Sequence, residues 1–588
     1  MVSIIKNQLL KHLSRFTKNL SADKINLSTF KGEGELTNLE LDEIVLTDLL
    51  ELPSWLRLTN AWCNKVSFRI QWTKLKSVPI FLSLDEVHID VETCEDLRSM
   101  SSPQGTSSYA GPTKYSFIHK VIDGITVAVN TVLITFKSPA FIASVQINRI
   151  MVESKSATWQ RCDLRTTRVK DPDRGQLLIF KELEWQTVRI EAQSTKDKNL
   201  TPLRLLTNQA RCRITIKKRI SDCFVMGSRL VIILDDLLWV LTDSQLKAAL
   251  HFLDSLGGLI EKATILERKT KAARKLEVLP EYQAQISQQS RTKSQCNSAI
   301  SKIFTRYDVV ETSYHFLSQR IDLHLCDDAG GGRSLHPDLK DGGALQISLV
   351  KFQIDYYPYH LAMADRKHWA KYKENATPHS QWLQQSLSSF RSQFMDLIDS
   401  GRTQHSPLTR SQGNVTASGM KGSGEHLEKN NQSQNPNVTP SEQKKSQHPS
   451  GNPVKNYVLE QLAKLMTTCI IIRIDDFTLY KVTTTSRNPI PKEFITGDRD
   501  RFSLPEDVTI LHAEFTYYYY PGDITFPLPP PKFYVQLNPI QINFDVCSCL
   551  WFNSFALNLH HSLMGKNKQL SSSRLIYFDV KIEAILPR

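Results

Sequence analysis

The sequence lacks the marks of a membrane-spanning chain and of several enzyme classes. No stretch approaches the roughly 18 consecutive apolar residues from which a transmembrane helix is read. It contains no GxSxG, no HExxH and no glycine-rich loop closing on Lys-Ser/Thr. "KGEGEL" at residues 31–36 lacks the third glycine of a dinucleotide loop, so we interpret it as a turn. We therefore expect neither a bilayer-spanning segment nor an enzyme.

Cysteine spacing and the first residues give two further exclusions. The ten cysteines show no CxxC pair or regular spacing, which suits free thiols in a reducing compartment such as the cytosol. Lys6 and Lys11 interrupt the apolar character of the opening segment, so we do not expect a cleaved targeting peptide. His324, Cys326 and Asp328 alternate onto one side of a strand, but no second ligand pair follows at a familiar spacing. We predict no metal site and no cofactor.

The excess of positive charge is mild. A net charge of +13 over 588 residues is not the dense basic stripe of a nucleic-acid binder, and an acidic lipid partner fits at least as well. Residues 201–230 carry seven Lys or Arg against one acid. Contact with phosphate head groups and a solvated strand edge explain this segment equally well. The candidates for head-group contact are Arg211, Arg213, Lys217, Lys218 and Arg219.

Alternation with a period of two runs through most of the chain and predicts β-strands. In "LDEVHIDVE", residues 87, 89 and 91 are apolar and share one face, while the residues between them are polar. In "GITVAVNTVLITF" one apolar set ends at Val129 and the next begins at Val132. We expect a bulge near Asn130 to cause that shift.

Predicted helices are few. They cover residues 4–20, 47–56, the stretch after Trp239, 380–398 and 551–563. Because they cannot shield both faces of so many strands, the apolar face needs another cover. A sandwich of two sheets is one solution. A sheet curled so that its apolar face lines a trough is the other, and it would spare lipid tails about 0.8 kcal/mol for each methylene kept from water.

Two sequence echoes indicate repeated units. "LHLCDD" precedes "IDYYPYH", and "IIIRIDD" precedes "FTYYYYPGD"; likewise "VIILDDLLWVLTDSQL" parallels "INFDVCSCLWFNSFAL". The aspartate pairs 235–236 and 475–476 recur at predicted strand ends, so turn formation explains them more simply than acid–base catalysis. Tyr-Tyr-Pro is read as the point where a strand leaves its ladder. The echoes suggest one sheet extended by added units.

Composition divides the chain into six segments. Residues 401–456 have hardly any large apolar side chains and are predicted to be a disordered linker. The other segments are an N-terminal module at 1–100, a strand-rich region ending in a helix at 101–260, a helical and basic linker at 261–300, and further strand-rich regions at 301–400 and 457–588.

The run from Ile25 to Val91 resembles the chorein N-terminal module: strand, glycine turn, strand, short helix, a strand with IxWxxLxxxP, and a strand. "HLSRFTKNLSADKINLS", "LDDLLWVLTDSQLKA" and "IDYYPYH" resemble bridge-like lipid transfer protein family 3, relatives of the Vps-thirteen and autophagy-two bridges. This resemblance extends over most of the chain. Members of the family run longer, and the chain stops in "IYFDVKIEAILPR", so we expect a truncated product, a short isoform or an incomplete gene model.

The resemblance implies a mostly β fold: an elongated, curved antiparallel sheet that forms a repeating β-groove with an apolar concave face and few helices. It also implies an N-terminal capping helix that presents Ile5, Leu9, Leu13 and Phe16. The groove-facing candidates are Val87, Ile89, Val91, Ile125, Val127, Val129, Ile214, Ile216, Leu345, Ile347, Leu349, Ile540, Ile542 and Phe544. We expect Asp at Val127 and Val129 to abolish lipid loading and leave the protein soluble.

The function implied by the resemblance is non-enzymatic transfer of glycerophospholipids between organelle membranes at contact sites. It further implies cytoplasmic residence, peripheral association with endosomes or Golgi-derived vesicles, self-association, and endosomal or Golgi trafficking proteins as partners. The main alternative is a β scaffold that tethers proteins without moving lipid. A nucleic-acid partner is the least favoured interpretation.

Overall fold

A computed structural model describes residues 14, 17–18, 26–28, 32–49, 52–98, 114–195, 201–278, 299–328, 342–369, 378–404, 453–484, 492–499, 503–505, 508–563 and 577–584. The chain divides into one unit formed by residues 1–376 and 464–588 and a second formed by residues 377–463. The predicted capping helix and most of the predicted linker at 401–456 lie outside the described residues.

The second unit contains two helices, α7 (Pro378–Gln404) and α8 (Pro453–Ala463). The helix predicted at 380–398 is therefore confirmed. Within this unit, Lys455 Nζ lies 3.3 Å from Asp399 Oδ2 and connects the two helices.

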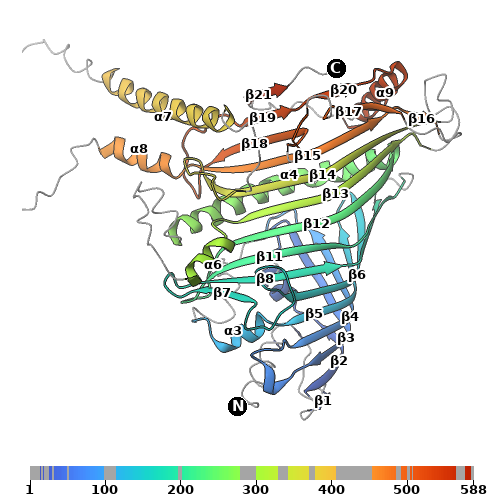
Figure 1. The fold of residues 1–588 in the computed structure, drawn as a ribbon, viewed down its shortest axis with the longest axis vertical. Helices are drawn as coiled ribbons and strands as arrows, with labels where there is room; N and C mark the ends of the chain where they lie inside the picture. The colour runs from blue at the N-terminus through green and yellow to red at the C-terminus, as the bar shows by residue number, and fades with distance from the viewer. Residues whose placement is uncertain are drawn as a thin grey trace, which may run out of the picture. The chain divides into compact units, whose positions relative to one another are not determined.

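The first unit is built on one large curved sheet of 21 strands (Figure 1). Its strands are β1 Asn26–Ser28, β2 Glu33–Glu40, β3 Leu56–Arg69, β4 Phe81–Thr93, β5 Thr126–Lys137, β6 Phe141–Ser154, β7 Arg168–Asp171, β8 Gln176–Trp185, β9 Thr187–Ser194, β10 Leu203–Thr207, β11 Ala210–Arg219, β12 Val225–Thr242, β13 Ser313–Cys326, β14 Gly343–Leu361, β15 Met466–Tyr480, β16 Thr483–Thr484, β17 Glu493–Gly497, β18 Leu511–Tyr519, β19 Lys532–Leu537, β20 Ile540–Ile542 and β21 Asp579–Ala584. The mostly β, curved and open sheet is as predicted.

The helices of this unit are α2 Glu43–Leu49, α3 Phe117–Ile122, α4 Asp243–Val278, α6 Ala299–Tyr307 and α9 Val546–Leu563, with a 3₁₀ turn at Trp72–Lys74. The helices predicted after Trp239 and at 551–563 are confirmed as α4 and α9. The helix predicted at 47–56 is wrong in its extent: α2 ends at Leu49, and Leu56 already begins β3, whose alternating side chains suit a strand.

Parallel joints divide the sheet into modules. Along the main ladder the order is β1, β2, β3, β4, β5, β6, β8, β11, β12, β13, β14, β15, β18, β19 and β21. Neighbours are antiparallel except at β4–β5, β12–β13 and β19–β21, which are parallel and require crossover connections. Five strands, β5 to β12, lie between the first two joints, and five more, β13 to β19, between the last two.

The modules confirm that the sheet is built from repeated units, but one of the two sequence echoes does not correspond to such a unit. The two tyrosine strands, β14 and β18, belong to the same five-strand module, so that echo does not mark two units. The other echo does: α4 follows β12 and α9 follows β20, and each helix lies in the crossover that precedes a parallel joint.

Backbone pairing is interrupted once near the middle of many strands. Between β5 and β6 the partners run from Val129–Ile150 to Thr131–Asn148, and Asn130 is left out. The pairing of β4 with β5 is interrupted at the same place, because Leu84 pairs with Val129 and Glu86 with Thr131. Leu84 and Val87, on the two sides of this interruption, pack in one apolar cluster. The predicted shift near Asn130 is thus confirmed. Its form is a break shared by neighbouring strands rather than one extra residue in a single strand.

The break corrects the interpretation of two motifs. Asp235 and Asp475 lie inside β12 and β15, beside the break rather than at strand ends, and Asp475 pairs with Lys351 at 3.0 Å. Pro358 lies inside β14, where the register shifts between Tyr357 and His360 because proline has no amide donor for the ladder. The later tyrosines end β18 as predicted.

Candidate functional site

A row of apolar residues crosses the sheet from β2 to β21. Each member is the direct Cα partner of the next, and direct partners present their side chains on the same face. The row is Gly34, Phe68, Leu82, Val127, Val152, Leu183, Cys212, Ile232, Phe316, Ile354, Ile472, Ala513, Val535 and Ile582. We call this face the apolar face. At the usual spacing of about 4.8 Å between strands, the row is about 60 Å long.

Most of this row is left partly uncovered. In the two five-strand modules, Ile232, Phe316, Ile354, Ile472 and Val535 are all half-buried, and none reaches full burial. An ordinary soluble sheet buries its apolar face and wets its polar one. Here the apolar side chains retain contact with solvent along several consecutive strands.

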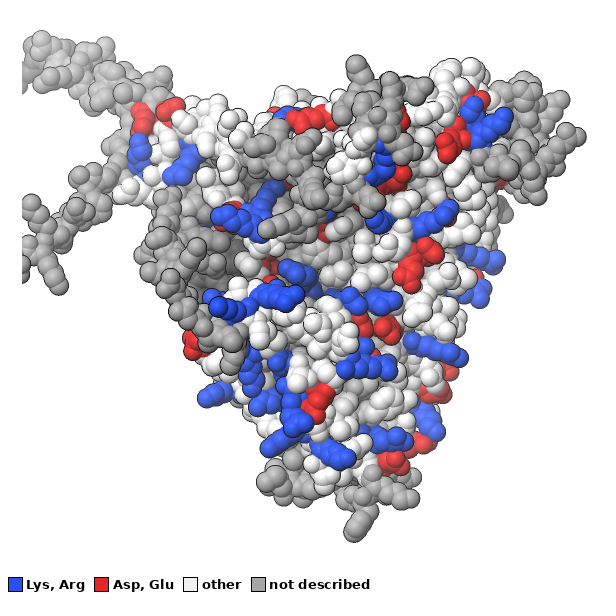
Figure 2. All heavy atoms as spheres, viewed as in Figure 1, with Lys and Arg blue, Asp and Glu red and all other residues white. Residues whose placement is uncertain are grey.

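The opposite face shows the reverse pattern. A second row of direct partners is displaced from the apolar row by one residue along each strand. Its members are Glu153, Glu182, Arg213, Val231, His315, Asp355, Ile471, Glu514, Tyr534 and Lys581. Asp355 is 0% exposed and Glu514 4% exposed, whereas apolar Ile354 beside them is half-buried. We call this face the polar face. Figure 2 shows basic and acidic side chains interspersed over much of the visible surface.

Ion pairs offset the cost of burying charge on the polar face. Lys155 Nζ lies 2.7 Å from Glu153 and 3.0 Å from Glu182, and Arg213 Nε donates to Glu182 at 2.9 Å. Burial works to raise the pKa of Glu182, but the bonds from Arg213 and Lys155 outweigh it and lower that pKa. Similar buried pairs join Arg473 to Asp355 and Arg366 to Glu514. The buried charges of the polar face are therefore paired with opposite charges.

Helix α4 lies along the apolar face. Near its start, Leu246 packs with Leu345 at one end of the strands, and the rings of Phe252 and Phe141 stack at 4.5 Å. Near its end, Ala272 and Leu276 pack in a cluster at the other end of the strands, with Met226, Met466 and Tyr519. Its 36 residues span about 54 Å. In Figure 1 the helix passes behind the strands.

At the N-terminal end, the predicted groove residues form a packed core. Val87, Val91 and Val129 are 6, 8 and 9% exposed. Half-buried Ile89, Ile125 and Val127 pack against them. Phe117 and Val121 of α3 belong to the same packing. The apolar face is thus closed over β2 to β5 by the chain's own side chains.

Farther along, the predicted groove residues are less uniform. Ile214, Ile216, Ile347, Leu349, Ile540 and Ile542 are half-buried in β11, β14 and β20. Leu345 is 1% exposed beneath Trp551 of α9, and Phe544, beyond the end of β20, is 73% exposed. One cation, Lys181, also occurs on the apolar face as the partner of Ile214; burial lowers its pKa to about 8.

The predicted head-group residues belong to β11, which is paired on both sides and is not a strand edge. Four of the five form ion pairs: Arg213 with Glu182, Lys217 with Asp308, Lys218 with Asp123, and Arg219 with Asp222. Lys217 is 1% exposed. Most of the positive charge of these five residues is therefore neutralised by carboxylates within the protein. Arg211 is the one of the five that takes part in none of these four pairs.

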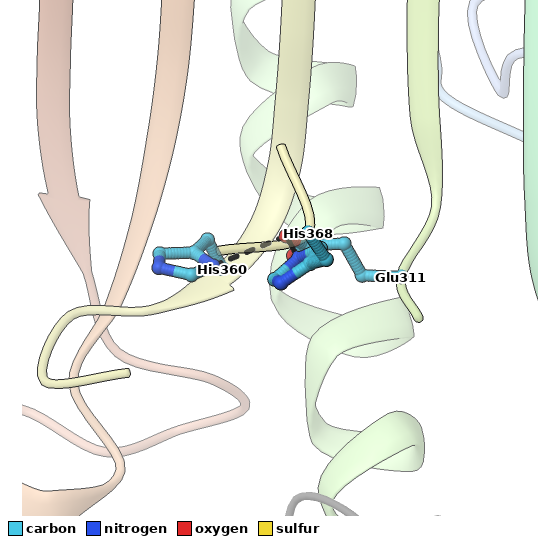
Figure 3. Close-up of side chains that lie close together, drawn as sticks. All are labelled: Glu311, His360 and His368. Carbon is cyan, nitrogen blue, oxygen red and sulfur yellow. Dashed lines mark hydrogen bonds and ion pairs between the residues drawn. The ribbon is translucent and has the colours of Figure 1, made fainter. Parts of the chain in front are cut away.

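A polar cluster that the sequence did not reveal surrounds Glu311 (Figure 3). Glu311 precedes β13, His360 belongs to β14, and His368 lies in the turn that follows β14. Glu311 Oε1 accepts hydrogen bonds from His360 Nδ1 at 3.1 Å, His368 Nε2 at 2.5 Å and Trp369 Nε1 at 2.6 Å. Burial alone would raise the pKa of Glu311, but the two histidines hold it well below its usual range.

The ligand atoms of Glu311, His360 and His368 lie within 4.8 Å of one another, as a metal ion would require. However, His360 Nε2 is buried without a hydrogen-bond partner. A histidine bound to metal ordinarily donates its second N–H to an acceptor. The arrangement therefore fits a hydrogen-bonded clamp that holds the turn after β14 against the polar face better than it fits a metal centre.

Among the described residues, no helix combines the length and the apolar character needed to cross a bilayer.

The fold and its two faces define a class of protein: a modular, open β-sheet whose apolar face is partly uncovered and whose polar face carries paired, partly buried charges. A family model for bridge-like lipid transfer protein family member 3A/B matches residues 1–583. The chain belongs to this family.

Individual relatives agree with the family model. The chain is 40% identical over 600 residues to bridge-like lipid transfer protein family member 3B of Mus musculus, covering 100% of this chain and 40% of that protein. It is 41% identical over 588 residues to member 3A of Homo sapiens, covering 96% and 39%. Intermembrane lipid transfer protein vps13F of Dictyostelium discoideum is 32% identical over 87 residues, covering 15% of this chain and 2% of that protein. The chain thus spans about 40% of the length of the family 3 relatives it matches.

Proposed function

We propose that this chain carries lipid with the acyl tails lying along the apolar face. The observation that carries the proposal is the apolar row: it continues without a polar member from β2 to β21, and within the two five-strand modules all its members except Cys212 are half-buried. The names of the relatives, which describe bridge-like and intermembrane lipid transfer, support the same function.

Energetics favour a continuous surface over isolated pockets. Moving a lipid tail through water costs about 0.8 kcal/mol for each exposed methylene, so a dozen methylenes cost about 10 kcal/mol. A tail that slides from one apolar strand to the next replaces contact with water by contact with protein at each step. Such movement requires no catalytic residue, and we propose a non-enzymatic function.

The finer features of the function rest on family membership. We propose glycerophospholipids as cargo, exchange between organelle membranes at contact sites, and cytoplasmic residence with peripheral attachment to endosomes or Golgi-derived vesicles. Self-association and trafficking proteins as partners belong to the same proposal. So do the chorein-like N-terminal module at 1–100, with its capping helix, and the division of the remaining chain into strand-rich regions and linkers.

The test is to place charge on each face in turn. Ile354 and Ile472 are partners on the apolar face. Leu238 and Val240 are exposed, alternate along β12 with the residues of the apolar face, and point to the polar face. We expect Ile354→Lys with Ile472→Lys to lose most co-purifying phospholipid in native mass spectrometry and most transfer between vesicles. Leu238→Lys with Val240→Lys is the matched control and should retain both.

Two results would contradict the proposal. One is retention of lipid by the apolar-face variant with its fold intact by circular dichroism. The other is a wild-type protein that purifies without lipid, which would favour the scaffold that tethers proteins without moving lipid.

A further inference from the structure

A basic pocket lies beside α3, in the crossover that precedes the first parallel joint. Its volume is about 620 Å³, and five of its nine lining residues are cationic. These are Lys76, Lys120, Arg165, Arg168 and Lys170. Figure 2 shows the corresponding gathering of Lys and Arg low on the visible face, over the α3 and β7 region of Figure 1. Among the residues that the structure describes, no acidic side chain lines the pocket.

The positive charge in this pocket is only partly neutralised. Arg165 pairs with Asp163 at 2.9 Å, whereas the structure records no ion pair for the other four cations with any described carboxylate. Burial lowers the pKa of Lys170, and the neighbouring charges of Lys120 and Arg168 lower it further. Like charges held together raise each other's energy, and a bound anion would relieve this repulsion.

Nearby acids are engaged elsewhere. Asp123, at the end of α3, accepts from Lys218 Nζ at 3.1 Å and from the Tyr115 hydroxyl at 2.9 Å. Asp171 is 0% exposed and lies 3.6 Å from Arg174. Asp123 and Asp171 therefore do not line the pocket.

Arg168 is held in place rather than left mobile. Its Nη1 donates to the carbonyl oxygen of Leu164 at 3.1 Å, and its Nη2 donates to that of Lys120. Its Nε is buried and has no hydrogen-bond partner. The guanidinium thus connects α3 to the loop before β7 and fixes the spacing of the cations around it.

The floor of the pocket is apolar. Leu75 and Leu164 are 6 and 5% exposed, and Leu75 and Phe117 belong to the cluster that closes the apolar face over β2 to β5. A cationic rim over an apolar floor suits a ligand that carries a concentrated negative charge on an organic body.

We propose that this pocket binds a phosphomonoester, presented either by a membrane lipid head group or by a soluble phosphate compound. Such a group carries about −1.5 to −2 charges at neutral pH and three strong acceptor oxygens, which lysine and arginine bind through charge-assisted hydrogen bonds. The site does not depend on lipid carriage along the apolar face, because its cations lie outside the apolar row.

The test uses the full 588-residue chain and lysines that are exposed, except for half-buried Lys120; replacement by glutamine keeps a polar side chain of similar length at each position. Lys120→Gln with Lys170→Gln removes two pocket charges; Lys74→Gln with Lys137→Gln removes two exposed charges elsewhere. Binding is measured by flotation with phosphatidylcholine vesicles that contain either a phosphoinositide with a phosphomonoester or phosphatidylserine at equal total charge. A calorimetric arm measures binding of a soluble inositol phosphate without vesicles.

We expect the phosphoinositide vesicles to bind, the pocket variant to bind at least tenfold more weakly, and the control variant to bind as the wild type does, since only the pocket variant loses charge-assisted hydrogen bonds to the phosphate. A stronger effect in the vesicle arm assigns the ligand to a lipid; an equal effect in the calorimetric arm assigns it to a soluble phosphate. Binding unchanged in the pocket variant, equal binding to phosphatidylserine, or no binding in either arm would overturn the proposal. Lipid loading of the apolar face is scored separately and is expected to be unchanged in both variants.

Discussion

The N-terminal strands and the two later modules use the same alternating pattern with different results. Over β2 to β5 the apolar residues pack into one cluster in which Phe68 is 7% exposed and Val129, on the same face, 9% exposed, while Leu82 and Val127 are half-buried. From β12 to β19, members of the same row such as Phe316 and Ile472 stay half-buried. Alternation therefore determines which residues share a face, but the neighbouring elements determine whether that face is covered.

The elements that make the difference can be named. At the N-terminal end, Phe117 and Val121 of short α3 insert directly into the cluster around Phe68. In the later modules the cover is α4, whose packing contacts on the sheet are concentrated towards its two ends. Between those two ends Ala263 of α4 is 1% exposed, whereas the short α3 packs into a single cluster.

The largest expected effect comes from truncating one phenylalanine in each region. Phe68→Ala removes a buried ring and should lower the free energy of unfolding by about 3–5 kcal/mol. Phe316→Ala, in the same row, should cost well under half as much, because the ring of Phe316 already contacts solvent. Urea unfolding followed by hydrogen exchange in β3 and β13 measures both. Equal losses would show that the two regions are packed alike.

Because of this contrast, lipid loading is better tested at Ile354 and Ile472 than at Val127 and Val129. Asp at Val127 and Val129 would place charge in the packed end of the row, where burial of an unpaired carboxylate destabilises the fold. Ile354 and Ile472 avoid this problem because they are half-buried. A stable, folded variant with Asp at Val129 would argue against a closed N-terminal end.

A second prediction concerns the clamp on the polar face of the later module. Glu311→Gln removes the charge from an acceptor of three hydrogen bonds and should cost about 1.5–3 kcal/mol of unfolding free energy at neutral pH. Since the folded pKa of Glu311 is depressed, its contribution is complete above the ordinary glutamate pKa of about 4.3 and is lost as pH falls through the folded value.

Unfolding of the wild type and Glu311→Gln across acidic pH measures this contribution. The stability difference should shrink as pH falls below the ordinary glutamate pKa towards the folded value. His368→Gln serves as the companion variant, because it removes one donor and leaves the carboxylate in place. A difference that grows as pH falls would contradict the assigned sign.

The smallest effect is expected at Gly34, the one glycine in the apolar row. A Cβ placed there would lie 2.2 Å from Cζ of Phe68, so the ring would have to move. Gly34→Ala should therefore cost about 1–3 kcal/mol, as overpacking usually does. Combining it with Phe68→Leu should recover part of the loss. Thermal unfolding of the single and double variants measures this, and full additivity would show that the ring is not the obstacle.

The sequence was sufficient for features that depend on neighbours in the chain. The change of alternation at Asn130 was visible because Val129 and Val132 are close together, and α4 and α9 follow from local helical patterns. The same local reasoning misplaced Asp235 and Asp475, because an aspartate in mid-strand is rare unless the ladder is interrupted there. That interruption is a property of neighbouring strands together.

Features built from distant segments could not be predicted. Lys120 and Lys170 meet in one pocket although they belong to α3 and β7, and Glu311 meets His360 across β13 and β14. Nor does the alternation of β18 reveal that polar His512 and Glu514 are the buried members and Phe515 the half-buried one. Which residues meet, and which side chains are buried, depends on the partner strands and on the elements that cover the sheet. The sequence of a single strand contains neither kind of information.

The parallel joints have a consequence for how such proteins can differ in size. The joints at β4–β5, β12–β13 and β19–β21 bound the two five-strand modules, so a further module could be inserted at a joint without changing the pairing within the existing ones. Every insertion would lengthen the hydrocarbon-compatible path by about 24 Å, the width of five strands. The length of the apolar row therefore changes in steps of one whole module rather than gradually.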